Sequence, residues 1–160
     1  EHPIPKSRER TIGLRANPDT RPDEHAIAEI DGVGISEKNG EIRADLYESS
    51  ISLSVPHSGD SVRIFAACNE SELVLQVDDA LVSTSHGGNR TRTGKIYVGN
   101  APDKISYAGT VQKVYVWNEF KEEGGGRDDI LGLLSAGSFL GVQMQFHFSA
   151  GRNSATIAAM

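Results

Sequence analysis

Residues 95–118 read KIYVGNAPDKISYAGTVQKVYVWN. Two runs within this stretch, 95–98 and 109–117, alternate polar and apolar residues for most of their length. Alternation with a period of two is typical of β-strands, in which successive side chains point to opposite faces of the sheet. Gly99 and Pro102 interrupt the pattern between the runs, and both residue types favour turns. The stretch therefore predicts two strands joined by a loop.

The same alternation continues toward the N-terminus in short segments that turn residues separate. Asn39-Gly40 is the strongest hairpin signal, because a type I′ turn needs positive φ at both of its central residues. No helical periodicity precedes residue 120, and the predicted segments recur about every ten residues. These segments are residues 11–16, 26–30, 34–38, 41–47, 50–55, 61–68 and 73–78. Short strands at this spacing predict an all-β antiparallel sandwich or barrel.

The two ends of the chain differ from this middle part. Residues 1–10 carry two prolines and no periodic apolar face, which predicts a linker or an extended lead-in strand. Residues 121–127 are charged and glycine-rich, and 128–134 have the acidic start of a short helical turn. Apolar and polar residues alternate strictly over 142–148, which predicts one more strand. Residues 150–160 are mostly small and polar, and we expect this end of the chain to fray. The chain thus divides into 1–10, a sandwich over 11–120, and a C-terminal part over 121–160.

Length and composition limit the classes of function. A chain of 160 residues has room for one domain, and no apolar run approaches the roughly 18 to 20 residues of a membrane-spanning helix. The net charge of −6 and the absence of a basic cluster argue against nucleic-acid binding. The only cysteine, Cys68, lies in an apolar run and is predicted to be a buried small hydrophobe. The chain begins at Glu1, so we expect it to be part of a longer protein.

Three stretches contain short strands in a set order, and the third of them also has glycines and a proline at set positions. They are residues 11–46 (TIGLRA, AIAEIDG and NGEIRADL), 60–79 (DSVRIF and LVLQVDD) and 95–118 (KIYVGNAP and YAGTVQKVYVWN). This series resembles the laminin G-like modules of the concanavalin A-like lectin/glucanase superfamily. The resemblance implies a jelly-roll sandwich that serves recognition, and in many such modules one calcium ion at the sandwich rim.

Paired carboxylates are a candidate catalytic site. Glu29 and Asp31 are two positions apart at a predicted strand end, and sandwich glucanases use such acids in a retaining mechanism. The third acid of that pattern is missing, because Val33 and Gly34 stand in its place. We therefore interpret Glu29 and Asp31 as a surface pair beside a turn and predict that the chain is not an enzyme. The histidines show no metal-ligand spacing.

Loop residues are the candidate binding groups. Carboxylates suit a hard cation, so Asp31 and Asp79 are the candidate ligands of the calcium ion that the resemblance implies. Arg90 and Arg92 lie in a polar loop and match ligand carboxylate or sulfate groups, because a guanidinium donates two parallel hydrogen bonds. Asp103 lies in a second loop and completes the predicted ligand-binding set.

Tyr115 and Trp117 share one face of the strand over 109–117, and Val114 and Val116 share the other. Either pair can face the core. We expect the aromatic pair to do so, with Trp117 as an anchor of the sandwich, because tryptophan is highly buried on average.

The sequence thus predicts a non-catalytic recognition module of an extracellular or cell-surface protein. It would bind a glycan or a protein through loops at the sandwich edge. We expect it neither to bind nucleic acid nor to insert into a membrane. Two glycosylation sequons, at Asn69 and Asn89, are consistent with an extracellular setting. The alternative is a structural domain that forms homo-oligomers through residues 124–160, because a strand behind a flexible hinge can pair with another chain.

Overall fold

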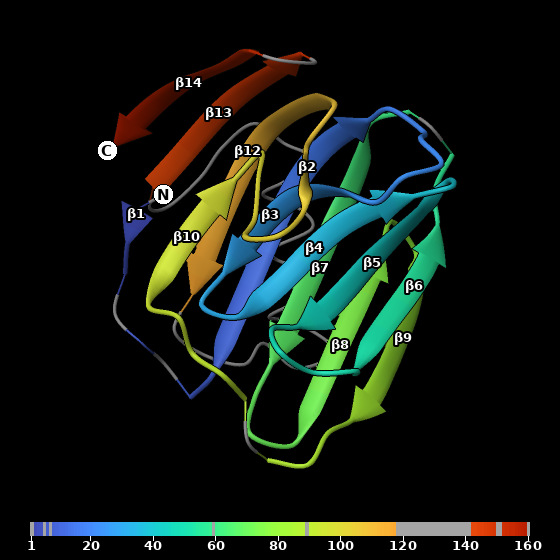
Figure 1. Cartoon of the computed structure of the whole chain (residues 1–160), viewed down its shortest axis with the longest axis vertical. Helices are drawn as coiled ribbons and strands as arrows, with labels where there is room; N and C mark the ends of the chain where they lie inside the picture. The colour runs from blue at the N-terminus through green and yellow to red at the C-terminus, as the bar shows by residue number, and fades with distance from the viewer. Residues whose placement is uncertain are drawn as a thin grey trace.

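A computed structural model describes residues 2–4, 6, 8–58, 60–88, 90–117, 142–149 and 152–159. Its strands form two seven-stranded sheets that pack face to face as a sandwich (Figure 1). Every strand pairing is antiparallel except that of β11 with β3, which is parallel. The predicted all-β antiparallel sandwich is therefore confirmed.

The two sheets draw on strands from all parts of the chain. Sheet A has the order β1-β10-β3-β4-β5-β6, with β11 beside β3, and sheet B has the order β14-β13-β12-β2-β7-β8-β9. The strands of sheet A are β1 (His2–Pro3), β3 (His25–Ile30), β4 (Val33–Lys38), β5 (Glu41–Leu46), β6 (Ser52–Pro56), β10 (Lys95–Val98) and β11 (Ile105–Ser106). Those of sheet B are β2 (Arg10–Pro18), β7 (Val62–Cys68), β8 (Glu72–Val77), β9 (Ala80–Ser85), β12 (Gly109–Trp117), β13 (Val142–Ser149) and β14 (Arg152–Ala159).

The Asn39-Gly40 hairpin forms as predicted. Asn39 has φ 53° and Gly40 has φ 84°, and Lys38 pairs with Glu41 across the turn. Positive φ at both central residues matches the twist of the flanking strands, which is why asparagine and glycine are favoured there. The turn from β3 to β4 has the same form, with Asp31 at φ 50° and Gly32 at φ 89°.

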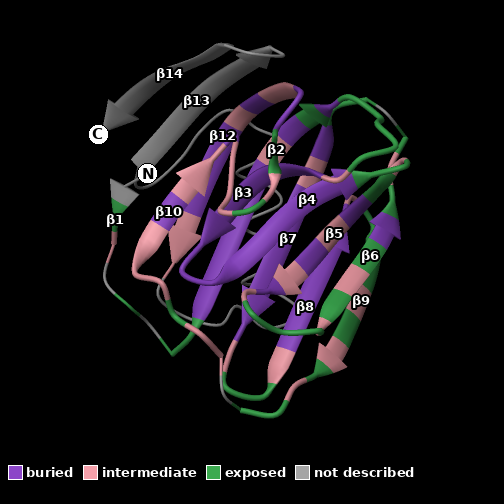
Figure 2. Cartoon of the chain, in the orientation of Figure 1, coloured by how far each residue is buried: buried purple, intermediate pink, exposed green. Residues whose placement is uncertain are grey.

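The core consists of aliphatic side chains between the two sheets. Ile12 and Leu14 of β2 and Ile64 of β7 are fully buried against Ile35 and Ile42 of sheet A. Figure 2 shows buried residues concentrated in the central strands, with β6 and β9 more exposed at one border. Cys68 belongs to this core, so the prediction of a buried small hydrophobe is confirmed.

A bulge in β12 reverses the predicted face of the aromatic pair. The register with β2 shifts between Val111 and Lys113, which inserts one extra residue into β12. Because side chains alternate along a strand, one inserted residue moves all later side chains to the other face. Val114 and Val116 therefore pack on the core between the sheets, while Tyr115, which is itself 2% exposed, and Trp117 stack on the other face of sheet B with ring centroids 5.7 Å apart. The prediction that Trp117 anchors the core is wrong.

The C-terminal part extends sheet B. β13 pairs with β12, with Gly109 opposite Phe148, so the strand predicted over 142–148 is present. The fraying predicted over 150–160 is wrong for residues 152–159, because β14 pairs with β13 along eight residues. The glycine-rich stretch 121–127 and the helical turn predicted over 128–134 lie outside the described residues. The described part contains no helix, and so none that could cross a membrane.

Candidate functional site

Asp31 is held in place by two arginines from distant parts of the chain. Its Oδ2 atom lies 3.0 Å from Nη2 of Arg10 and 3.8 Å from Nη2 of Arg90. The backbone N–H of Gly94 donates to Oδ1 over 2.8 Å, and Arg90 also donates to the backbone oxygen of Asp31. All three charged side chains are at most 3% exposed. A buried group of charges is tolerated only when opposite charges and hydrogen bonds within it offset the cost of removing each charge from water.

The loop that carries Arg90 packs tightly on the turn from β3 to β4. A Cβ atom at Gly32 would lie 1.9 Å from the backbone oxygen of Thr91, so only glycine allows this approach. Asp31 and Gly32 thus fix the position of Arg90. The Asp31-Gly32 sequence that forms the turn also positions the loop.

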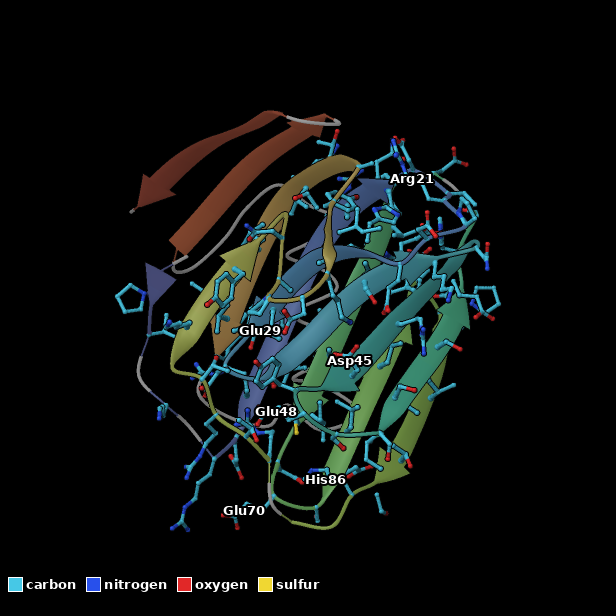
Figure 3. The ribbon with its side chains drawn as sticks, viewed as in Figure 1. Arg21, Glu29, Asp45, Glu48, Glu70 and His86 are labelled. Atoms are coloured by element: carbon cyan, nitrogen blue, oxygen red, sulfur yellow. The ribbon has the colours of Figure 1, made fainter. Side chains whose placement is uncertain are left out.

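Arg90 is one of the residues that line a pocket at one end of the sandwich, which we call the arginine pocket. Its volume is about 320 Å³. Arg92 is exposed, and the side chain of Arg8 is 76% exposed and lies 3.5 Å from Glu70. Figure 3 shows Glu70 and His86 at the same end of the molecule. The pocket is lined by Arg8, Asn69, Glu70, Gly88, Arg90, Thr91 and Arg92.

Asn69 shapes the wall of the arginine pocket next to Cys68 and His86. The side-chain oxygen of Asn69 accepts hydrogen bonds from the backbone N–H groups of Ser71 and Glu72, both over 2.8 Å. Its backbone oxygen lies 2.9 Å from Nε2 of His86 and 3.3 Å from Sγ of Cys68. The turn from β7 to β8 is therefore rigidly defined.

Cys68 and His86 do not form a nucleophile and its base. Sγ and Nε2 lie 3.7 Å apart, but both groups donate to the same oxygen of Asn69. The N–H of Gly88 points to Nδ1 of His86, which places the ring proton on Nε2. Burial raises the pKa of Cys68 to about 11, so the thiol is neutral at physiological pH. This pair is structural.

Only part of the predicted site comes together. Arg90 and Arg92 share the arginine pocket, and Asp31 lies beneath it. Asp103 is exposed in the loop after β10, beside Lys104, whose ammonium group contacts Asp45 and Glu24. That loop runs toward the start of β3, where β11 pairs, and so leads away from the pocket.

Asp31 and Asp79 lie at opposite ends of the sandwich. Asp31 contacts Arg10 at the start of β2, whereas the turn of Asp79 contacts Arg63, which pairs with Arg15 farther along β2. The two carboxylates therefore do not share one ion, and the guanidinium groups around Asp31 do not suit a cation. Among the described residues no three His, Cys, Asp or Glu side chains are grouped to hold a metal. Calcium binding stays a prediction.

Glu29 and Asp31 are buried, so their interpretation as a surface pair is wrong. Glu29 is 2% exposed and accepts hydrogen bonds at Oε1 from the N–H of Gly32 over 2.5 Å and the hydroxyl of Thr93 over 3.2 Å. Its Oε2 atom is buried without a hydrogen-bond partner among the described residues. Burial raises the pKa of Glu29, and the nearby Asp31 and Asp45 carboxylates add to that direction.

Replacing Glu29 with glutamine is expected to increase the free energy of unfolding at pH 7. The folded chain binds the Glu29 proton more tightly than the unfolded chain does, so stability falls as pH rises from the ordinary value of 4.5 through the raised pKa. Glutamine keeps the oxygen acceptor and removes the charge. The difference from the original chain should shrink as pH falls below 4.5, as measured by urea unfolding at several pH values. A difference that is independent of pH, or matched by the exposed Glu48→Gln variant, would contradict this account.

A second buried polar cluster was not predicted from the sequence. The Glu37 carboxylate accepts hydrogen bonds from the backbone N–H groups of Arg21 and Gly40, over 3.2 and 2.6 Å, and from His25. His57 lies 3.4 Å from its Oε1 atom. Nδ1 of His25 accepts from the N–H of Ala108, so the proton of His25 resides on Nε2 and points to Glu37.

This cluster holds the loop of an open pocket of about 750 Å³ at the other end of the sandwich. The pocket is lined by residues 17–23 together with His25 and Ile105. Glu37 and the two histidines come from three separate elements, and no local spacing connects them in the sequence. Only the register of β3 with β4, which places His25 opposite Glu37, brings them together.

No protein-family model and no curated protein sequence matches the chain. Solved structures with the same fold do match. A heptameric pentraxin from Limulus polyphemus is 13% identical with a TM-score of 0.66, over 99% of this chain and 83% of that one. A candidate carbohydrate-binding protein from Bacteroides ovatus is 12% identical with a TM-score of 0.64, over 100% of this chain. Domains LG4-5 of the mouse laminin α1 chain are 16% identical with a TM-score of 0.53, over 75% of this chain.

These matches establish the fold, which is the concanavalin A-like jelly roll predicted from the sequence. The chain spans 56% of the Bacteroides protein and 39% of the laminin fragment.

Proposed function

We propose that the chain is a non-catalytic recognition module that binds an acidic ligand, a carboxylated or sulfated glycan in the first place, through the arginine pocket. One observation carries the proposal. In a chain of net charge −6, Arg8, Arg90 and Arg92 line a single pocket. A local concentration of guanidinium groups on an acidic molecule favours an anion at that place.

The three arginines have different roles in this proposal. Arg90 is almost buried and is held by Asp31, so it adds positive charge beside the pocket from a side chain that is already ordered before a ligand binds. Arg92 and Arg8 are exposed and supply paired N–H donors that fit the oxygens of a carboxylate or sulfate group. Glu70 pairs with Arg8 at the surface, and a ligand anion would replace that weak contact.

A recognition module agrees with the other features of the chain. The jelly roll places loops at its ends, where ligand-binding residues commonly lie on a rigid scaffold. The acids considered for catalysis are unsuited to it, because Asp31 is paired with arginines and Glu29 is covered. An extracellular or cell-surface location belongs to the proposal, because recognition of an acidic glycan fits it.

Replacing Arg92 with alanine is expected to weaken binding of a sulfated oligosaccharide by about tenfold or more, because hydrogen bonds to charged groups are worth about 1.5–3 kcal/mol. Isothermal titration with a heparin-derived tetrasaccharide as the probe, at two salt concentrations, measures the effect. The matched control is Arg21→Ala, since Arg21 is also a partly exposed arginine but lies at the other end of the sandwich (Figure 3).

Two results would contradict the proposal. In the first, Arg92→Ala and Arg21→Ala weaken binding equally, which would indicate nonspecific charge attraction. In the second, the chain binds the sulfated probe no better than its desulfated form.

A further inference from the structure

β9 forms one edge of sheet B. It pairs with β8 in an unbroken register from Ala80↔Val77 to Ser85↔Glu72, and no other described strand pairs with it. Figure 1 shows β9 at the border of the sandwich, beside the edge strand β6 of sheet A. An edge strand presents a row of backbone N–H and C=O groups that can pair with another chain.

The register fixes which backbone groups of β9 face outward. Ser85 lies opposite Glu72 in the β8–β9 ladder, so the next opposed pair is His86 and Ser71. The backbone N–H of His86 donates to the backbone oxygen of Ser71, which makes this a hydrogen-bonded pair. Hydrogen-bonded pairs alternate along an antiparallel ladder, so Ala80, Val82 and Thr84 also direct their backbone groups to β8. The backbone groups of Leu81, Ser83 and Ser85 therefore point away from the sheet.

β9 has none of the features that usually protect an edge. Natural edge strands carry charges, proline or a bulge to prevent pairing. β9 reads ALVSTS, its register has no bulge, and the side chain of Leu81 is an exposed large hydrophobic. The neighbouring stretch 49–58, which contains β6, and residues 80–88 lack Asp, Glu, Lys and Arg, although 24% of the whole chain is charged.

The charges beyond the two ends of β9 are opposite in sign. Asp78 and Asp79 precede the strand, and Asp79 is fully exposed. The loop of the arginine pocket, with Arg90 and Arg92, follows it. Two such strands paired antiparallel would place the acidic end of each copy beside the basic end of the other. A symmetric contact also brings equivalent residues together, which an uncharged strand tolerates without like-charge repulsion.

We propose that β9 is a homodimer interface, in which it pairs antiparallel with β9 of a second copy of the chain about a twofold axis at Ser83. Ser83 is the middle of the three residues whose backbone groups face outward, so this register uses all of them. Ser83 of one copy lies opposite Ser83 of the other, and the two exchange both N–H···O bonds. The two B sheets then form one continuous sheet.

Replacing Ser83 with proline is expected to weaken the dimer and leave the fold intact. Proline removes only an outward-facing N–H, and proline is tolerated on edge strands at such positions. Two hydrogen bonds are lost per dimer. At about 1 kcal/mol each, their loss raises the dissociation constant of the dimer about thirtyfold. Light scattering after size exclusion and sedimentation equilibrium of the whole chain measure the mass, and Ser83→Ala, which keeps the N–H, should remain dimeric.

A charge exchange at the same position tests the register even if the proline variant does not fold. Ser83→Lys and Ser83→Glu each place like charges opposite one another, so each protein alone should be weakened toward monomer. An equimolar mixture of the two should recover the dimer as a heterodimer, because opposite charges then meet on the axis.

The proposal is overturned if the unaltered chain is monomeric at roughly 100 μM, a concentration at which a contact with micromolar Kd is fully formed. It is also overturned if Ser83→Pro leaves the dimer dissociation constant unchanged, which would place the contact elsewhere, for example in residues 124–160. A mixture of the lysine and glutamate variants that stays monomeric, while each variant retains its circular dichroism spectrum, would exclude the twofold register at Ser83.

Discussion

Replacing Glu37 with alanine is expected to lower the free energy of unfolding by about 3–5 kcal/mol, the cost of breaking a buried charged hydrogen-bond group. The Glu37 carboxylate is 0% exposed and accepts from the N–H groups of Arg21 and Gly40 and from His25. Its removal takes the acceptor from the N–H groups of Arg21 and Gly40 and leaves buried His25 with only the backbone oxygen of Asp19, while His57 loses a buried neighbour. Urea unfolding followed by tryptophan fluorescence and circular dichroism measures the loss.

The matched control for this prediction is Glu41→Ala, because Glu41 lies in the same hairpin but is exposed. We expect that variant to change stability by less than about 0.5 kcal/mol. A Glu37→Ala protein as stable as the control would show that the cluster does not hold the loop over residues 17–23.

Replacing Asp31 with alanine is expected to cost about 3–5 kcal/mol of stability, because two guanidinium groups would stay buried without their shared carboxylate. Arg10 and Arg90 are almost completely buried beside it. The same change should reduce binding of the sulfated probe, since Asp31 would no longer hold the Arg90 side chain in position at the arginine pocket. Unfolding and titration together measure both effects.

Asp79→Ala is the control for the Asp31 prediction, since Asp79 was predicted to share its role but is fully exposed at the other end. It should leave both stability and binding nearly unchanged. If Asp31→Ala is as stable as Asp79→Ala, the three-residue ion group does not stabilise the fold. If it is destabilised but binds the probe with unchanged affinity, Arg90 does not depend on Asp31 for its position.

The sandwich could be predicted because its determinants are local. Alternation along 109–117 and the Asn39-Gly40 turn each depend on neighbouring residues only. The face of Tyr115 and Trp117 could not be predicted in the same way. It depends on one extra residue in β12 that is visible only when the strand is paired with β2.

The candidate site could be predicted only in part, for a similar reason. Arg90 and Arg92 are close in sequence, so one loop places both in the pocket. Asp31 is buried against Arg10, and Arg8 lines the pocket, because the paired strands bring together segments that are far apart in the sequence. Glu37 was missed because its partners come from separate loops, and a glutamate followed by a lysine in a polar hairpin gives no signal of burial.

The most direct test of the central claim is a screen of the purified chain against an array of acidic and neutral glycans, once with calcium and once with a chelator. We predict binding to carboxylated or sulfated glycans and none to their neutral counterparts. A signal that survives the chelator would agree with recognition by the arginine pocket, whereas a signal lost with the chelator would contradict it, because the guanidinium groups around Asp31 do not suit a cation. Binding confined to neutral glycans, or no binding by a folded chain under either condition, would contradict the proposed function.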